Sequence, residues 1–263
     1  MADLEALLAD FTAECADLDR LIADLDPDGW QRDTPAAGWT IAHQIAHLNW
    51  TDQVATVSAT DPVEFDKLVQ AALPKALTFV DEAAEKGAKT PAPQLLATWR
   101  QDRADLVEAL RTVPAGTKLP WFGPPMSPAS MVTARLMETW AHGHDVADTL
   151  GVTREPTARL RHIAHIGVRT RNFAYLTHGK SVPAEEFRIE LTAPDGSAWT
   201  WGPAEAAQRI SGPALDFCQL VTQRRHLDDL ALDVVGADAR EWLGLAQAFA
   251  GPPGSGRTAG QFD

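Results

Sequence analysis

Glu138 and His142 are the first residues whose types and spacing could do chemistry. Side chains four residues apart on a helix project from one face, one turn apart, so this carboxylate and this imidazole could hold a single ion. Asp145 lies on the same face and could accept from the ring nitrogen of His142 that a metal does not use. His144 points about 120° away by the helical period. Such pairs are common by chance, so the surroundings must decide.

The residues around this pair are apolar on more than one side of the helix. They are Ala134, Leu136, Met137, Trp140 and Ala141. A helix that is apolar around a narrow polar stripe is typically buried. A buried carboxylate and a buried imidazole need compensating partners, because uncompensated burial of polar groups is costly. A bound metal ion is one such partner, so the sequence favours a metal site here.

A second polar cluster contains His43 and His47, which are also four residues apart. Either could supply a third ligand, and the His-x-x-x-His spacing is itself a possible metal clamp. Two histidines and one carboxylate form a common catalytic zinc set, which leaves one position open for water or substrate. The spacing alone does not choose between His43 and His47.

Helices are expected to position all of these residues. Apolar residues recur at helical spacing over 2–25, 40–60, 63–86, 92–113 and 128–150, with no convincing strand among them. Thr40 is a suitable N-cap, and Ser127 followed by Pro128 is a good helix start. Gly151 can supply the left-handed residue that ends the last helix. The first 150 residues therefore predict a helical bundle.

The pattern changes after Gly151. Alternating residues over 187–193 and 198–202 flank a turn signal at 194–197 and predict a β-hairpin, and 230–236 is a third strand candidate. Further helices are expected over 157–178, 204–210, 213–224 and 237–250. We therefore expect a mainly α protein with two domains: a metal-binding helical bundle over residues 1–152 and a small α+β domain over 153–263.

The composition limits the possible partners. The chain has 36 acidic and 23 basic residues and a formal net charge of −13, which argues against binding to nucleic acid or to an anionic membrane surface. No stretch approaches the ~18 apolar residues of a membrane span, and the N-terminal residues do not resemble a signal peptide. Cys15 and Cys218 lie far apart, which favours a reduced, cytoplasmic setting.

Two sequence motifs carry a family resemblance. The run GWTIAHQIAHLNW, followed about ninety residues later by SPASMVTARLMETWAHGHDVADTLG, resembles the DinB-like metal-binding superfamily. It is most similar to the branch that contains mycothiol-dependent maleylpyruvate isomerase, which joins an N-terminal four-helix bundle to a small α+β domain. The run DFCQLVTQRRHLDDLALDVVG resembles the second domain of that branch.

The resemblance implies a set of site residues. Its metal triad corresponds to His47, Glu138 and His142, with His43 one turn away, either lining the pocket or packing. An arginine of the second domain contributes to the family's active site, and Arg224 and Arg225 both match it. The candidate catalytic set is therefore Arg224, Arg225 and His43.

The resemblance also implies an activity. A divalent metal, zinc above all, lowers the pKa of a bound thiol, so mycothiol is the expected cosubstrate and an electrophilic small molecule the expected substrate of an isomerase or transferase. One alternative is a thiol-independent metal-dependent cyclase, lyase or hydrolase of a specialised biosynthetic pathway. Another is a non-catalytic metal-binding protein. A monomer or a homodimer is expected, and Trp39, Trp50, Trp121 and Trp140 are expected to wall a substrate pocket or to pack in the core.

Overall fold

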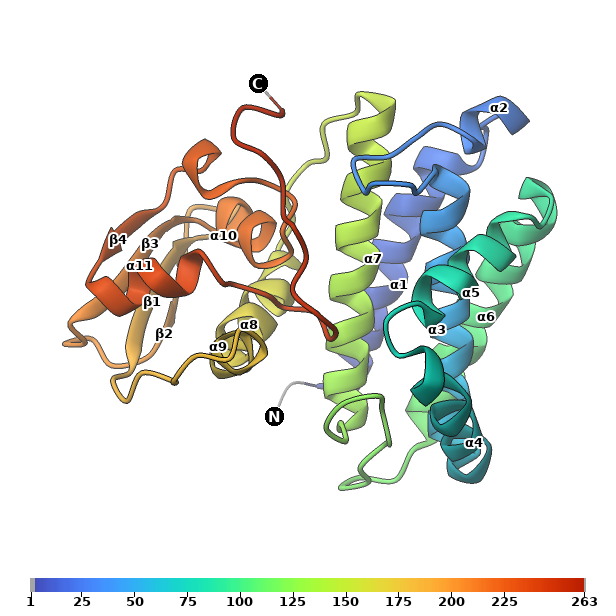
Figure 1. The fold of residues 1–263 in the computed structure, drawn as a ribbon, viewed down its shortest axis with the longest axis horizontal. Helices are drawn as coiled ribbons and strands as arrows, with labels where there is room; N and C mark the ends of the chain where they lie inside the picture. Colours follow the sequence, from blue (N-terminus) through green and yellow to red (C-terminus); the bar gives the residue numbers. More distant parts are fainter. Residues whose placement is uncertain (1–2, 263) are drawn as a thin grey trace. The chain divides into compact units, whose positions relative to one another are not determined.

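The computed structural model describes residues 3–262. The polypeptide divides into two compact units, the first ending at Arg154 and the second beginning at Glu155. Figure 1 shows the elements of each unit, with the helical unit in blue to yellow-green and the mixed unit in yellow to red. None of the helices within residues 3–262 is long and apolar enough to cross a membrane.

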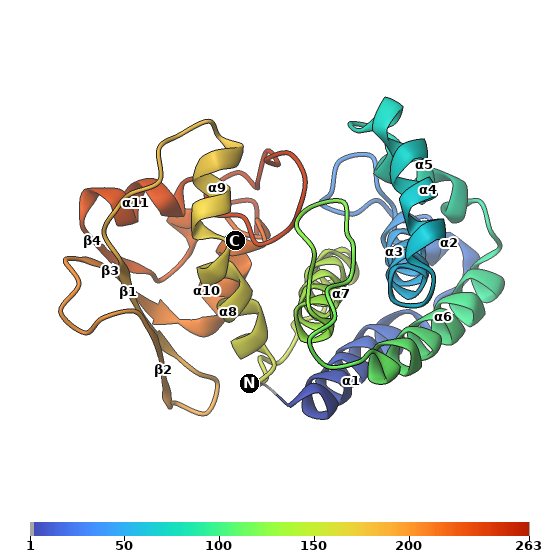
Figure 2. The same ribbon diagram turned by 90° about the horizontal axis from the view of Figure 1, so that it is seen from below.

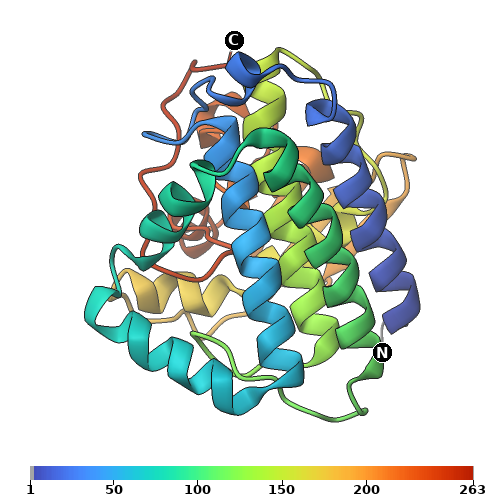
Figure 3. The same ribbon diagram turned by 90° about the vertical axis from the view of Figure 1, so that its right-hand side faces the viewer.

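The first unit is a bundle built on four long helices. These are α1 (Leu4–Ile22), α3 (Ile41–Thr60), α6 (Ala92–Thr112) and α7 (Pro128–Leu150). Helix α3 packs against α6 and α7, and α1 packs against α7, so that the long helices lie side by side in Figure 3. Their apolar stripes form the core, which includes the fully buried Phe11, Ile45, Trp99 and Leu136. The mainly α fold is confirmed, both the helical bundle predicted from periodicity and the four-helix bundle implied by the family resemblance.

Shorter elements complete this unit. They are α2 (Pro27–Trp30), α4 (Pro62–Ala72), the 3-10 turn η1 (Leu73–Lys75) and α5 (Phe79–Ala88). The helical structure expected over 63–86 is present but interrupted, because Pro74 has no backbone N–H to continue the helical hydrogen bonds. Helix α5 lies close to α3: a Cβ added at Gly87 would come within 2.8 Å of the Cβ of Ala46.

The ends of α7 follow the predicted signals. The Ser127 hydroxyl accepts from the backbone N–H of Ser130 at 3.1 Å, and Pro128 occupies the first helical position. Gly151 ends the helix with a left-handed φ of 69°. These signals set the length of the helix that carries Glu138 and His142.

The second unit contains a four-stranded sheet in the order β2-β1-β3-β4. The strands are β1 (Phe187–Thr192), β2 (Ala198–Trp201), β3 (Gln208–Pro213) and β4 (Asp233–Val235). Strand β1 pairs antiparallel with β2 and parallel with β3, and β4 pairs antiparallel with β3. The predicted hairpin and the third strand candidate are both present, which confirms the small α+β part of the predicted fold.

Helices cover one face of this sheet. They are α8 (Leu160–Arg169), α9 (Arg171–Thr177), α10 (Ala214–Val221) and α11 (Ala237–Leu243), with a 3-10 turn η2 (Leu227–Asp229). Trp242 of α11 meets both Phe187 of β1 and Phe217 of α10 edge to face, so the strands and both helices share one core. Figure 2 shows the course of these strands and helices.

Two predictions about this unit are wrong. The helix expected over 204–210 is not formed, and Gln208 begins strand β3 instead. The Ala-rich run AEAAQ favours a helix locally, but pairing with β1 and the complete burial of Ile210 outweigh that preference. The closing helix expected over 237–250 ends at Leu243. Residues 244–245 form a turn, and Ala248 then donates its N–H to the carbonyl of Val221 instead of continuing the helix.

Candidate metal centre

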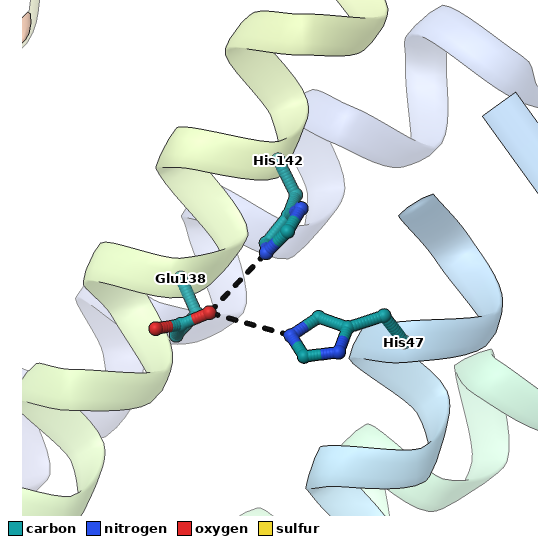
Figure 4. A group of neighbouring side chains, drawn as sticks. All are labelled: His47, Glu138 and His142. Carbon is teal, nitrogen blue, oxygen red and sulfur yellow. Dashed lines mark hydrogen bonds and ion pairs between the residues drawn. The ribbon is translucent and has the colours of Figure 1, made fainter. Parts of the chain in front are cut away.

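Three side chains from two helices of the bundle converge on one point. His47 extends from α3, and Glu138 and His142 extend from successive turns of α7 (Figure 4). One ligand atom from each residue lies within 4.8 Å of the others. Glu138 Oε2 is 3.2 Å from Nε2 of His142 and 3.4 Å from Nε2 of His47. Among residues 3–262 this is the cluster whose atoms are spaced to hold a metal ion.

The cluster is largely shielded from solvent. The exposed fractions of the side chains are 10% for His47, 21% for Glu138 and 12% for His142. Burial raises the pKa of the Glu138 carboxyl, but the hydrogen bonds from His142 and His47 outweigh burial and hold that pKa well below its usual range. Glu138 is therefore a carboxylate, ready to bind a cation.

The donor set fits a divalent metal. Two imidazole nitrogens and one carboxylate oxygen are ligands that zinc accepts in tetrahedral sites with one open position. Gln44 Oε1 accepts from Nδ1 of His142, so Nε2 is the nitrogen left to face the cluster. Both Nε2 atoms face Glu138 Oε2, so these three atoms can ligate one ion together.

His43 does not belong to this cluster. Its Nδ1 accepts from the backbone N–H of Thr40 at 3.2 Å, which helps to cap the start of α3. Because Nδ1 is an acceptor there, the ring proton resides on Nε2 and is donated to Glu85 Oε2 at 2.9 Å. The structure thus groups His47, and not His43, with the pair on α7; a catalytic role for His43 stays a prediction.

Gln44 was not predicted from the sequence to be a site residue, although its position in the helix was informative. It is a polar residue between Ile41 and Ile45, on the buried side of α3, and its exposed fraction is 0%. A buried amide in such a position needs polar partners, and His142 is one. Asp145 is also fully buried on α7, and its support of His142 stays a prediction.

Aromatic rings surround the two imidazoles. Trp39 stacks on His142 with ring centroids 5.9 Å apart and tilts over His47 at 5.4 Å. Trp50 lies 6.3 Å from His47 and continues into a cluster with Phe79 and Phe122. Trp50 also lines a pocket of about 430 Å³ between α3, α5 and α6. These rings give the site an apolar wall.

The other two tryptophans contact other aromatic rings. Trp121 contacts Phe122 edge to face and so extends the aromatic cluster beyond Trp50. Trp140 stacks on His144 at 4.8 Å and is 5% exposed, so it packs in the core.

Arg224 and Arg225 lie in the second unit, just after α10. Gln223 has a φ of 59° and ends this helix, with Arg224 N–H donating to the carbonyl of Gln219 and Gln223 N–H to that of Leu220. This turn fixes the direction in which the two arginines leave the helix. The guanidinium of Arg225 lies 3.8 Å from the ring centroid of Phe262. The role of either arginine in a reaction stays a prediction.

Comparison with known proteins identifies the family of the chain. Residues 11–147, more than half of the chain, match the model of the mycothiol maleylpyruvate isomerase N-terminal domain. The chain belongs to this family. The predicted resemblance is therefore confirmed. A second model, described as wyosine base formation, matches residues 183–234.

Relatives and solved structures extend the comparison. Uncharacterized proteins from two strains of Mycobacterium tuberculosis are 57% identical to this family member, over 98% of the chain and 100% of their own length. Crystal structures of a mycothiol-dependent maleylpyruvate isomerase and of a histidine-to-alanine mutant share its fold, with TM-scores of 0.59 and 0.60. They cover 84% and 88% of this chain and 90% and 93% of their own, at 17% and 16% identity.

Proposed function

We propose that the protein is a metal-dependent enzyme that uses a low-molecular-weight thiol, with mycothiol the first candidate, to attack an electrophilic small molecule. The observation that carries the proposal is the convergence of His47 Nε2, Glu138 Oε2 and His142 Nε2 within 4.8 Å. Zinc is the proposed metal, and isomerisation or S-transfer is the proposed reaction. Membership of the mycothiol maleylpyruvate isomerase family supports the choice of thiol.

The ligand set suits this chemistry. Two neutral imidazoles and one carboxylate contribute a single negative charge, so a divalent ion keeps a net positive charge at the site. When bound, such an ion lowers the pKa of a coordinated thiol and supplies a thiolate at neutral pH.

The chain's own residues supply the rest of the reaction. Trp39 and Trp50 flank the ligands and limit the access of water to the position where the thiol would react. Arg224 and Arg225 are proposed to bind an acidic group of the substrate, since a guanidinium pairs well with a carboxylate. We propose that the reaction takes place in a reduced cytoplasm, in which the two buried cysteines would stay as thiols.

Steady-state kinetics test the proposal. The zinc-loaded protein is assayed with maleylpyruvate and with an aromatic chloro-electrophile, with and without mycothiol, and before and after removal of metal by a chelator. We expect turnover of at least one electrophile only when thiol and metal are both present. Turnover that depends on neither would refute the proposal, and turnover that needs metal but no thiol would favour the thiol-independent class of enzyme.

A further inference from the structure

We infer that Gln44 and Thr34 are positioning residues that orient His142 toward the metal and hold Trp39 against both imidazoles. Gln44 lies on α3, and Thr34 and Trp39 lie in the loop that precedes this helix. The inference uses the metal site of the proposed function, but it requires no thiol chemistry.

The hydrogen bonds fix the orientation of the Gln44 amide. The Thr34 hydroxyl donates to the carbonyl of Trp39 at 2.7 Å, so its own proton is in use. It must therefore accept from Gln44, whose Nε2 lies 2.8 Å away. The amide oxygen of Gln44 is then the atom that faces Nδ1 of His142.

This orientation determines which nitrogen of His142 can bind a metal. An amide oxygen only accepts hydrogen bonds, so Nδ1 of His142 must carry a hydrogen. Nε2, which faces Glu138 at 3.2 Å, is the nitrogen left to ligate. Gln44 is completely buried, so water does not readily replace its oxygen if the side chain is removed.

The same chain of hydrogen bonds holds Trp39. Its carbonyl accepts from both the N–H and the hydroxyl of Thr34, at 2.8 and 2.7 Å. Its indole N–H donates to Asp81 Oδ1 of α5 at 3.1 Å. With both ends held, the indole lies nearly parallel to the His142 ring, at an angle of 17°. Orientation of the ligand and placement of the aromatic wall therefore depend on one network.

The Gln44 side chain differs in charge from the usual partner of a metal-bound histidine. Many metal-bound histidines donate to a carboxylate, which adds negative charge next to the metal. A neutral amide orients the ring without that charge, so Glu138 remains the single anion of the ligand set. The second imidazole differs: Nδ1 of His47 is buried and has no hydrogen-bond partner among residues 3–262. His142 is thus the firmly oriented histidine of the pair.

Metal affinity provides the first test. Zinc dissociation constants of the full-length variants are measured by competition with a chromophoric chelator. We expect Gln44→Leu to weaken zinc binding by about 10–100-fold, the usual effect of losing a group that orients a metal ligand. Gln44→Glu keeps an acceptor for Nδ1 of His142 and should bind zinc more tightly than Gln44→Leu. Gln53→Leu, on the same helix but bonded to Asp102, is the matched control.

NMR of the zinc-loaded protein provides the second test. In the wild type we expect a slowly exchanging Nδ1–H resonance for His142, because Gln44 holds that proton in a buried hydrogen bond. Gln44→Leu should abolish its protection. Thr34→Val, which leaves the ligands and Gln44 in place, should increase its exchange and weaken zinc binding to a smaller degree. It also tests the network if Gln44→Leu fails to fold.

Defined outcomes would overturn the inference. Zinc affinity within about twofold of wild type in both Gln44→Leu and Thr34→Val, with Nδ1–H still protected, would show that the network does not orient His142. A wild-type protein that binds zinc but turns over no electrophile with thiol would defeat the proposed function, and the same affinity measurements would still decide the role of Gln44.

Discussion

Glu138 contacts both imidazoles through one carboxylate oxygen, Oε2. The two Nε2 atoms and this oxygen lie within 4.8 Å of one another, so they can ligate one ion together. Gln44 supports His142 from the opposite side of its ring. The chemistry of the site therefore depends on a few side chains whose polar atoms already point at one another.

Loss of one ligand should empty the site. We expect His142→Ala to retain at most about a tenth of the wild-type zinc after gel filtration, since a tetrahedral site would keep only two protein ligands. Elemental analysis of the purified variant measures this directly. Full zinc occupancy in His142→Ala would falsify the ligand assignment.

His43→Ala is the matched control for that experiment. It removes a histidine one turn away from His47 that caps α3 and pairs with Glu85. We expect wild-type zinc content, together with a loss of about 0.5–1 kcal/mol in the free energy of unfolding from the weakened cap. Loss of zinc from this variant would instead place His43 in the metal site.

Helices α3 and α7 carry the three ligands, and a buried ion pair connects them. Arg135 Nε donates to Asp52 Oδ1 at 2.9 Å, and the two side chains are 2% and 0% exposed. Arg135 precedes Glu138 by one turn of α7, and Asp52 follows His47 on α3. This pair sets the spacing of the two helices directly beside the metal ligands.

Breaking this pair should be costly. We expect Arg135→Met to lower the free energy of unfolding by about 3–5 kcal/mol, because Asp52 would remain buried without its charge partner. The double variant Arg135→Met with Asp52→Leu should recover most of that loss. Urea denaturation of the metal-free proteins measures both values, with the exposed Lys67→Met as a control that should be unchanged. A single variant as stable as wild type would contradict this account.

A second ion-pair group joins α1 to α6. Asp19 accepts from Arg100 and Arg103 at 2.6–2.8 Å. The hydrogen bond from Arg100, together with Arg103 and against the opposing effect of burial, lowers the pKa of Asp19. A carboxyl group whose pKa is lower in the folded than in the unfolded chain stabilises the fold. This stabilisation is complete when the pH is above the pKa of the unfolded chain, and it is lost as the pH falls through the pKa of the folded chain.

The lowered pKa of Asp19 determines how stability should depend on pH. Asp19→Asn should be less stable than wild type at pH 7, and the gap should shrink as the pH falls below about 4, the ordinary pKa of an aspartate. Urea denaturation of both proteins over a series of pH values measures the gap. A gap that does not change with pH would show that the Asp19 carboxylate contributes no charge-dependent stability.

All three ligands and their supporting residues lie in the first of the two units. The bundle has its own core, which includes Phe11, Ile45 and Trp99. The second unit has a separate core around Phe217 and Trp242. Metal binding should therefore be a property of the bundle, whereas turnover is proposed to need Arg224 or Arg225 as well.

Separate expression of the two units tests this division. We expect a fragment of residues 1–154 to fold and to bind zinc within about tenfold of the affinity of the full chain, since every ligand and Gln44 are present. Residues 155–263 serve as the control and should bind none. Circular dichroism reports folding and elemental analysis reports the metal. A folded bundle fragment without zinc would contradict the prediction.

The sequence by itself determined the features that are local in the chain. Helical spacing identified the long helices, Ser127, Pro128 and Gly151 set the ends of α7, and the four-residue spacing placed Glu138 and His142 on one face. Each of these depends on residues within a turn or two of one another, where backbone geometry fixes the outcome. The hairpin of β1 and β2 was also predictable, because its turn lies between its strands.

Only the tertiary structure decided which distant residues meet. His47 and Glu138 are 91 residues apart, and Gln44 and His142 are 98 apart. Spacing did not distinguish His43 from His47, and the family resemblance selected His47. The packing of α3 on α7 brings His47 to Glu138. His43 instead forms hydrogen bonds with Thr40 and Glu85. Strand β3 likewise depends on distant residues: it forms against its helical preference because it pairs with β1. Burial and pairing between distant residues stabilise such elements, and a local sequence pattern does not contain this information.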